Sequence, residues 1–311
     1  MNKRFSDSLK VLLSLCFLFY AWNFSNQHNE QLENRIVKYP RLFCICSTTT
    51  PRHRDRVKAV RKTWGKRCDR LIFASDSYDY DLQTYQFFPA SGRKYISFKM
   101  YRAWIYVYKN FISKEKEYPE NEYHWFVKGD DDTFIIVENL RKHLARLDPS
   151  EPHYMGHPFS KNDSIYHRHY ISGALEILSK ESVRRLVERA MPYTDLCPTP
   201  KLWANEDAFL GYCLGSIGIK PNGLFDEIGR NRFMALALWN HFHYKKLTIS
   251  EGHLIQQNDK TYKKGEMCCA PDAISFHYSP NEYMLSLEFL IYRFKSFTNY
   301  LNATGKDEEI D

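Results

Sequence analysis

Apolar residues occur in short blocks along the chain. Some blocks are continuous, as in buried strands, and others are spaced three or four residues apart, as on one face of a helix. The segment Arg41 to Ser47 (RLFCICS) is rich in apolar residues, as a buried strand requires. Val57, Val60 and Trp64 then recur at the spacing of one helix face, and Leu71 to Ala74 (LIFA) predicts a second short strand. This order of strand, helix and strand is typical of a βαβ unit.

The alternation continues downstream. Tyr95 to Ile112 predicts an aromatic-rich helix, and Tyr123 to Val127 (YHWFV) predicts a third apolar strand. Further helical stripes follow at Leu140, Leu144 and Leu147, at Val183, Leu186, Val187 and Ala190, at Leu210, Cys213, Leu214 and Ile217, and over Tyr283 to Phe294. We therefore expect an α/β fold.

The N-terminal segment Val11 to Trp22 (VLLSLCFLFYAW) is nearly all apolar and follows Lys3, Arg4 and Lys10. It predicts either a cleaved signal peptide or a short signal anchor, and the bulky YAWNF stretch favours the uncleaved anchor. A buried N-terminal helix is the third alternative, which positive charges at only one end disfavour. We expect a cytoplasmic tail (1–10), a transmembrane anchor (11–24), a luminal stem (25–40), a catalytic domain (41–297) and an acidic, disordered tail (298–311).

Composition narrows the class of protein. The 311 residues are 43% hydrophobic and 26% charged, which excludes collagen, coiled coils, multi-span membrane proteins and mostly disordered chains. The net charge of +7 is modest, and the longest basic cluster, Arg52 to Arg61, is diluted by Asp55 and apolar residues, so we expect no nucleic-acid partner.

Cysteine usage fits an oxidising lumen. One of the eight cysteines, Cys16, lies in the apolar segment, and the seven that follow are an odd number, so at least one is free or bridges to another chain. No CxxC pair recurs, which argues against a structural zinc site. Sequons at Asn23, Asn162 and Asn302 are individually weak signals of glycosylation.

Three adjacent carboxylates, Asp130, Asp131 and Asp132, follow the apolar strand directly. Their mutual repulsion is costly without a cation, and hard oxygen ligands suit Mg²⁺ or Mn²⁺, which bridge to nucleotide phosphates. Ligands of open α/β sheets gather at the carboxyl ends of strands. A solvated acidic turn or a helix cap is the alternative; the strand before and the helix after favour a metal site.

Two other motifs carry candidate chemistry. Glu206 and Asp207 begin a predicted helix, where the helix dipole favours carboxylates, so local evidence alone indicates capping. His277 lies in the sequence SFHY, and a single histidine is more often structural than a ligand, although imidazole does bind borderline metals. Neither motif assigns a function by itself.

Together, four segments resemble a known family. They are WFVKGDDDTFIIVENL, YISGALEILSKESV, NEDAFLGYCLGSIGI and CCAPDAISFHY. In this order they resemble the fringe-like beta-1,3-glycosyltransferases over about Leu42 to Phe294, and the last is similar to the core 1 beta-1,3-galactosyltransferase branch. The resemblance implies a GT-A type nucleotide-sugar transferase fold with a mixed, mostly parallel sheet between helices. It also implies a single-pass type II protein of the Golgi (or ER–Golgi) membrane, with a luminal catalytic domain, and a homodimer.

The resemblance also implies roles for individual residues. Asp130, Asp132 and His277 would bind Mn²⁺ (or Mg²⁺), and Asp130, Asp131 and Asp132 would face the UDP-galactose donor. Asp207 would be the catalytic base, and Trp239, Gly173 and Glu206 would lie on the acceptor side. Cys44 with Cys68, Cys197 with Cys213, and Cys268 with Cys269 would pair, leaving Cys46 as the odd thiol.

The activity implied is inverting transfer of galactose from UDP-galactose to the 3-hydroxyl of GalNAc on Ser or Thr of a glycoprotein. A metal held by Asp132 and His277 would stabilise the departing diphosphate, and Asp207 would take the acceptor proton. Because these two ligands are far apart in sequence, this arrangement requires the C-terminal segment to fold back over the sheet.

One segment departs from the family pattern. The family reads SGGAGYVLS where this chain reads SGALEILS at Ser172 to Ser179, which is one residue and two glycines shorter and introduces Glu176. We interpret this segment as an acceptor-side loop, so its change leaves the donor and acceptor open. A non-catalytic, chaperone-like luminal protein is the other alternative, and the retained Asp132, Asp207 and His277 favour an enzyme.

Overall fold

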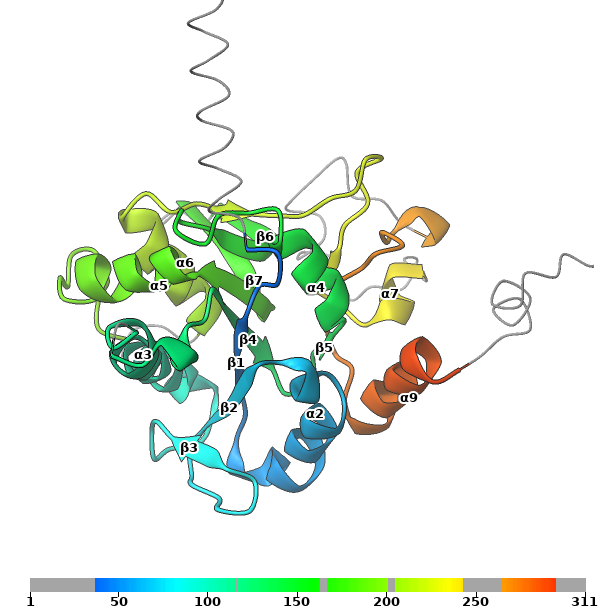
Figure 1. Ribbon diagram of the computed structural model, residues 1–311, viewed down its shortest axis with the longest axis horizontal. Helices are drawn as coiled ribbons and strands as arrows, with labels where there is room; N and C mark the ends of the chain where they lie inside the picture. The colour runs from blue at the N-terminus through cyan, green and yellow to red at the C-terminus, as the bar shows by residue number, and fades with distance from the viewer. Residues whose placement is uncertain (1–36, 116, 163–166, 201–204, 243–264, 295–311) are drawn as a thin grey trace, which may run out of the picture.

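The computed structural model describes residues 37–115, 117–162, 167–200, 205–242 and 265–294. Helices cover both faces of a central sheet (Figure 1). Three of the helices, α3, α5 and α6, lie on one side of the sheet, and α2, α4 and α9 lie on the other. The predicted α/β class is confirmed.

The central sheet has seven strands in the order β3-β2-β1-β4-β7-β6-β8. Pairing is parallel between β1 and β2, β1 and β4, β2 and β3, and β6 and β8, whereas β7 runs antiparallel to β4 and β6. The strands are β1 (Leu42–Ser47), β2 (Arg70–Ser75), β3 (Thr84–Gln86), β4 (Trp125–Asp130), β6 (Tyr154–Asn162), β7 (His167–Ser179) and β8 (Pro221–Asn222). The sheet is therefore mixed and mostly parallel, as expected.

The predicted helices form, but several are shorter than their apolar stripes. The α-helices are α2 (Lys58–Lys62), α3 (Ile96–Val107), α4 (Val137–Leu144), α5 (Lys180–Arg185), α6 (Glu206–Ser216), α7 (Leu238–Phe242) and α9 (Asn281–Tyr292). The α3 stripe continues beyond Val107 as a π-helical turn over Tyr108–Ile112. A stripe of apolar residues fixes which face is buried, but it does not distinguish an α-helix from a π-helical turn.

Strand β1 is apolar at nearly every position because both of its faces are covered. In β1, Phe43 and Ile45 pack toward α3 and α6, whereas Cys44 and Cys46 pack toward α2 and α4. Successive side chains of a strand point to opposite faces, so a strand between two helical layers needs apolar residues at every position. This explains why Leu42–Ser47 is buried at all six positions.

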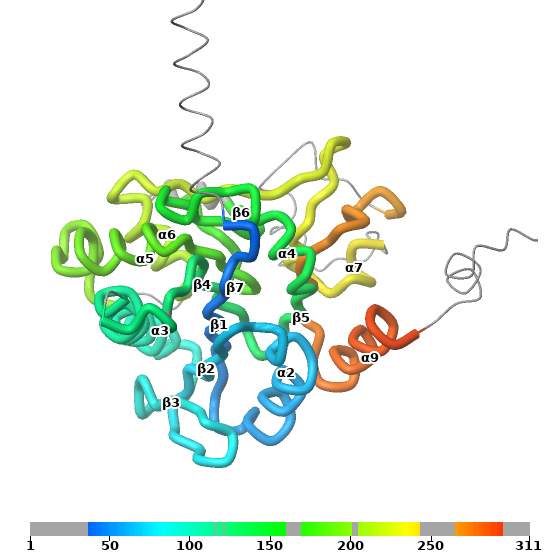
Figure 2. The backbone as a smooth tube through the Cα atoms, in the orientation of Figure 1, coloured from blue at the N-terminus to red at the C-terminus, as the bar shows by residue number. Residues whose placement is uncertain are grey.

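A second, three-stranded sheet brings the C-terminal part of the chain back to β4. It has the order β5-β10-β9, with β5 at Phe134–Ile135, β9 at Phe233–Met234 and β10 at Ser275–Phe276. β10 pairs antiparallel with β5, which begins four residues after β4 ends. Figure 2 shows the orange segment that contains β10 alongside the green β5. The chain therefore folds back as the predicted metal site requires.

The two longest strands, β6 and β7, were not among the predicted elements, and the Ser172–Ser179 loop interpretation is wrong. Ser172 to Ser179 are the last eight residues of β7, in the interior of the sheet. Gly173 and the charged Glu176 interrupt the apolar alternation that would indicate a strand. β7 tolerates a charged residue here because Lys128 of β4 lies beside Glu176.

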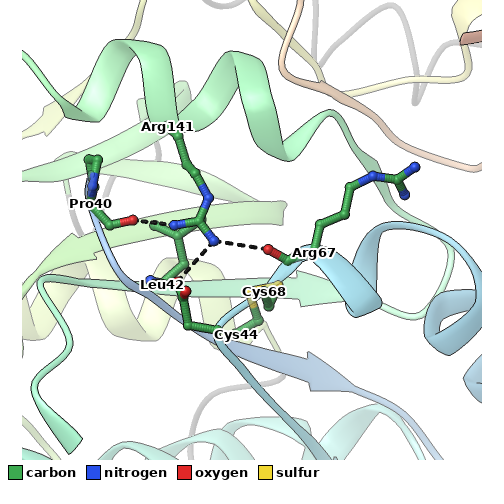
Figure 3. The surroundings of a disulfide bond; sticks show 7 residues. Pro40, Leu42, Cys44, Arg67, Cys68 and Arg141 are labelled. Carbon is green, nitrogen blue, oxygen red and sulfur yellow. Dashed lines mark hydrogen bonds and ion pairs between the residues drawn. A yellow bond between two sulfur atoms is a disulfide. The ribbon is translucent and has the colours of Figure 1, made fainter. Parts of the chain in front are cut away.

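All three predicted disulfides are present, and Cys46 is free and buried. The Cys44–Cys68 bridge ties β1 to the segment before β2. Arg141 of α4 lies beside it and donates hydrogen bonds to the backbone carbonyls of Pro40 and Arg67 (Figure 3). The bridge and this arginine hold the N-terminal end of β1 against the segment before β2.

The expected anchor (11–24), the tail before it and most of the stem lie outside the described residues, as does the acidic tail (298–311). Within the described part of the chain, no helix has the length and apolar character needed to cross a membrane. The predicted anchor therefore stays a prediction.

Candidate active site

A cavity of about 570 Å³ opens at the carboxyl ends of β1, β2 and β4. Its lining includes residues from several parts of the chain. They include the segment after β1 (Thr49, Pro51, Arg52), Asp76 after β2, the start of α3 with the residue before it (Tyr95, Ile96, Lys99), β4 and the turn after it (Asp130, Asp132), β7 (Gly173), the start of α6 (Glu206, Asp207) and the C-terminal segment (His277, Tyr278). This is the edge where open α/β sheets bind their ligands.

Asp130, Asp132 and His277 meet on one wall of this cavity. Nε2 of His277 lies 3.4 Å from Oδ1 of Asp132 and 3.9 Å from Oδ2 of Asp130. One ligand atom from each residue falls within 4.8 Å of the other two. The backbone holds the arrangement, because the Ser279 amide donates to the Asp132 carbonyl at 2.7 Å.

The three residues fit a divalent cation. Oδ1 of Asp130 is buried and accepts no hydrogen bond from the described residues, although Nζ of Lys128 lies 3.0 Å away. Nδ1 of His277 lies 3.0 Å from the Ala235 carbonyl and donates there, so the neutral ring would offer its Nε2 lone pair to a cation held by the carboxylates. Two carboxylates and one imidazole suit a borderline to hard metal such as Mn²⁺.

The charges of the three groups are strongly linked. Burial opposes the charged form of Asp132, but the His277 hydrogen bond and the Arg56 guanidinium outweigh it and lower the pKa of Asp132 to about 2. Burial opposes the charged form of His277 too, yet Asp132 and Asp130 raise its pKa. Arg56 also pairs with Asp132 at 2.8 Å. His277 and Arg56 therefore both offset the negative charge of the two carboxylates on this wall.

Asp131 does not join this group, and its predicted contact with the donor stays a prediction. Its carboxylate is fully buried and accepts hydrogen bonds from the Thr48 hydroxyl at 2.7 Å, Arg56 at 2.9 Å and Arg52 at 3.2 Å. It is not among the residues that line the cavity. Asp131 therefore holds the loops after β1 and β4 together.

Asp207 lies in the first turn of α6 and lines the same cavity. Its Oδ2 accepts a hydrogen bond from the Gly173 amide at 3.2 Å, and its Oδ1 accepts from the Ala208 amide at 2.7 Å. Burial and the neighbouring Glu206 charge raise the pKa of Asp207 to about 6, although both amides favour the charged form. The carboxylate is therefore mostly ionised at neutral pH, as expected, and is a stronger base than an exposed aspartate.

The three predicted acceptor-side residues have different surroundings. Gly173 lines the cavity beside Asp207. Glu206 also reaches the cavity, but its carboxylate is hydrogen-bonded to the buried Lys128. Trp239 lies on α7 with 61% of its surface exposed, and it is not among the cavity-lining residues. The structure brings Gly173 and Glu206 to Asp207 and leaves Trp239 outside this cavity.

Glu176, the residue that departs from the family pattern, is also outside the cavity. It is 1% exposed, and the Tyr154 hydroxyl donates to its Oε1 at 3.2 Å. Burial and the charges of Glu206 and Asp207 raise its pKa well above the usual range, although the Lys128 ammonium opposes this shift. Its substitution for a family residue changes the interior of the sheet and not the acceptor wall.

Sequence reasoning missed three residues of this region. Lys99 and Tyr278 line the cavity, and Lys128 lies beneath it. A signal existed for Lys99, because it shares the buried face of α3 with Met100 and Ala103, where a charged residue is unusual. Tyr278 has a positive φ of 47°, which its sequence does not indicate.

Comparison with known proteins places the chain among glycosyltransferases. The family model described as Fringe-like matches residues 37–226, which is more than half of the chain. The chain belongs to the Fringe-like family. The predicted relationship to fringe-like beta-1,3-glycosyltransferases is thereby confirmed.

Individual Fringe-like relatives differ in the sugar that their names specify. The chain is 27% identical over 271 residues to glycoprotein-N-acetylgalactosamine 3-beta-galactosyltransferase 1 of Xenopus laevis, covering 87% of this chain and 70% of that protein. It is 27% identical over 188 residues to beta-1,3-glucosyltransferase of Mus musculus, covering 59% of this chain and 35% of that protein. A solved glycosyltransferase involved in the glycosylation of the major capsid of PBCV-1 aligns with 47% of this chain and 62% of its own, at 14% identity and a TM-score of 0.28.

Proposed function

We propose that this protein is an inverting, metal-dependent beta-1,3-galactosyltransferase of the GT-A fold. It would transfer galactose from UDP-galactose to the 3-hydroxyl of GalNAc linked to Ser or Thr of a glycoprotein. The observation that carries the proposal is that one cavity contains both the Asp130–Asp132–His277 cluster and the ionised Asp207. The galactosyl donor and GalNAc acceptor are taken from the relative that aligns with most of this chain.

On the donor side, Asp130, Asp132 and His277 would hold a divalent cation, whose charge offsets that of the departing diphosphate. Three basic side chains, Arg52, Arg93 and Lys99, line the same cavity and would face the phosphates. Lys99 is 5% exposed, and its ammonium donates to the Thr48 carbonyl at the end of β1. Buried charges of this kind act more strongly on a bound anion than exposed ones do.

On the acceptor side, Asp207 would accept the proton of the sugar hydroxyl as the new C–O bond forms. The Gly173 and Ala208 amides hold both of its oxygens, so the carboxylate keeps one orientation. A single attack from the face opposite the leaving diphosphate inverts the anomeric centre. No covalent intermediate on the protein is required.

A different donor is the second candidate, since the chain is as similar in identity to a beta-1,3-glucosyltransferase, over a shorter segment. A non-catalytic, chaperone-like role is less well supported, because such a protein has no need for a candidate base and candidate metal ligands in one cavity. We also propose a luminal address in the secretory pathway with the N-terminal segment as anchor, consistent with three disulfides among the described residues.

A donor panel tests this proposal. The full chain would be incubated with Mn²⁺, a GalNAc-threonine peptide and, in separate reactions, UDP-galactose, UDP-glucose and UDP-N-acetylglucosamine, while UDP release is followed. We expect release mainly from UDP-galactose, and none after addition of EDTA. Stronger release from UDP-glucose would select the second donor. Absence of peptide-dependent release from every donor would refute the enzymatic proposal.

A further inference from the structure

Lys128 lies beneath the candidate active site and contacts the elements that form it. It belongs to β4, two residues before Asp130, and its side chain is completely buried. Its Nζ donates to the Gly173 carbonyl of β7 at 2.7 Å and to Oε1 of Glu206 in α6, and it pairs with Oδ1 of Asp130 at 3.0 Å. One ammonium group therefore joins β4, β7 and the start of α6.

Two of the residues that Lys128 contacts, Gly173 and Glu206, are themselves linked to Asp207. Gly173, whose carbonyl accepts from Lys128, uses its own amide to bind Oδ2 of Asp207. Glu206, the other acceptor, is the residue before Asp207 in the chain. Lys128 thus holds Asp207 through two independent connections, and it holds Asp130 through a third.

The packing at Gly173 is what allows these groups to meet. A Cβ atom at this position would lie 3.1 Å from Oε1 of Glu206, 3.4 Å from Nζ of Lys128 and 3.5 Å from Cβ of Asp207. A side chain here would therefore crowd the Glu206 carboxylate and would lie in direct contact with Lys128 and Asp207. The backbone of β7 therefore acts as the spacer between Lys128 and α6.

The charge of the ammonium is secure in this environment. Three carboxylates surround it: Glu206 accepts its hydrogen bond, Asp130 lies 3.0 Å away and Glu176 lies 3.7 Å away. Buried ion pairs contribute little net stability compared with apolar residues of the same volume. The presence of a lysine here is therefore not explained by a gain in stability. It is explained if the lysine fixes the positions of the charged groups around it.

We propose that Lys128 is the positioning residue of this active site: it sets the placement of the candidate base Asp207 relative to the candidate metal ligand Asp130. This inference rests on the proposed function, because those two roles define what must be aligned. A shift of about 1 Å between reacting groups lowers rates by about 100-fold. Lys128 would act through Gly173, Glu206 and Asp130, without touching either substrate.

The first test needs no activity. Hydrogen exchange of the Gly173 and Ala208 amides, which bind the two oxygens of Asp207, would be compared in wild type and Lys128→Met. We expect exchange at these amides to become at least about tenfold faster, while amides of β1 on the other side of β4 stay unchanged. Unchanged exchange at Gly173 and Ala208 would overturn the proposal.

The second test measures the reaction. In Lys128→Met, kcat per folded molecule should fall at least about 100-fold, while the KM for the nucleotide sugar changes by less than about threefold. A purely structural role would instead lower activity only in proportion to the folded fraction, with kcat per folded molecule unchanged, and that result would also overturn the proposal. If Lys128→Met does not fold, Lys128→Gln takes its place with the same expected direction, since its amide can donate but carries no charge.

Glu176→Gln is the matched control. Glu176 is also a buried neighbour of Lys128, with Oε2 at 3.7 Å from Nζ, but it contacts neither Gly173 nor Asp207 by a hydrogen bond among the described residues. Since Glu176 takes no part in the contacts that join Lys128 to Gly173, Glu206 and Asp207, the amide should leave both exchange and kcat within about threefold of wild type. An effect as large as that of Lys128→Met would refute a specific role for Lys128.

The two proposals fail separately. If the wild-type chain transfers no sugar, the proposed function is wrong, and the exchange result alone decides whether Lys128 positions Asp207. If the wild type is active and the Lys128 variants keep their kcat, the proposed function stands and the positioning role is wrong.

Discussion

At the scale of single residues, Asp207 carries a direct prediction about pH. The carboxylate must be ionised to accept a proton, and its pKa is raised to about 6. Activity should therefore be constant above pH 7 and fall about tenfold per unit well below pH 6. The pH profile of kcat/KM measures this. An acid limb near the usual aspartate value of about 4 would contradict the assignment of Asp207 as the base.

His277 carries a prediction about metal dependence. Removing a residue that only hydrogen-bonds to a metal ligand weakens metal binding about 10–100-fold, so removing a ligand itself should cost at least as much. We therefore expect His277→Gln to need about 10-fold or more Mn²⁺ for half-maximal activity. Manganese titration of the initial rate measures this. His143→Gln is the control, because His143 also bonds a carboxylate, Asp272 at 3.0 Å, but is not among the cavity-lining residues. Equal manganese requirements in the two variants would exclude His277 as a ligand.

The candidate site was largely predictable at this scale, with instructive exceptions. The resemblance indicated Asp130, Asp132, His277 and Asp207, and the structure brings them into one cavity. The sequence could not set Asp131 apart, because β4 ends at Asp130 and the partners of Asp131, namely Thr48, Arg52 and Arg56, are distant in sequence. The contacts of Glu206 were equally hidden, since they depend on Lys128, which is also distant in sequence.

At the scale of elements, the Cys197–Cys213 bridge holds the helix that carries Asp207. It joins α6 to the segment after α5 and spans 16 residues. Replacing both cysteines by serine should lower the free energy of unfolding by about 3 kcal/mol, mainly because the unfolded chain gains freedom. Chemical denaturation measures the change.

The vicinal pair Cys268–Cys269 is the control for that prediction. Its two residues are neighbours in sequence, so the bridge closes no chain loop of significant length. The same double substitution should therefore cost less than about 1 kcal/mol through this effect. A larger loss for Cys268–Cys269 than for Cys197–Cys213 would contradict the loop explanation.

The sequence predicts strands and helices whose buried positions are all apolar. It does not predict a strand such as β7, in which glycine and a charged residue interrupt the apolar positions. Leu42–Ser47 is apolar at nearly every position because both faces are covered, which sequence reveals directly. β7 contains Gly173 and Glu176 for reasons that lie in other elements, namely the close approach of α6 and the charge of Lys128. Local pattern cannot report partners that the fold brings together.

At the scale of the whole molecule, the decisive feature is the return of the chain to β4. β10 pairs with β5, and this contact places His277, 145 residues beyond Asp132 in sequence, against the end of the central sheet. The need for such a return followed from the proposed ligands, but its route through a small second sheet required the structure. The cavity is therefore built jointly by the N-terminal βαβ unit and the C-terminal segment.

The central claim is that this cavity transfers a sugar with Asp207 as base. The most direct measurement is the mass of a GalNAc-threonine peptide after incubation with the full chain, UDP-galactose and Mn²⁺. We predict a galactosylated peptide in wild type, and a rate about 10²–10⁴-fold lower in Asp207→Asn. Asp195→Asn, the same change at an exposed position, should match wild type. Full product formation by Asp207→Asn would contradict the account.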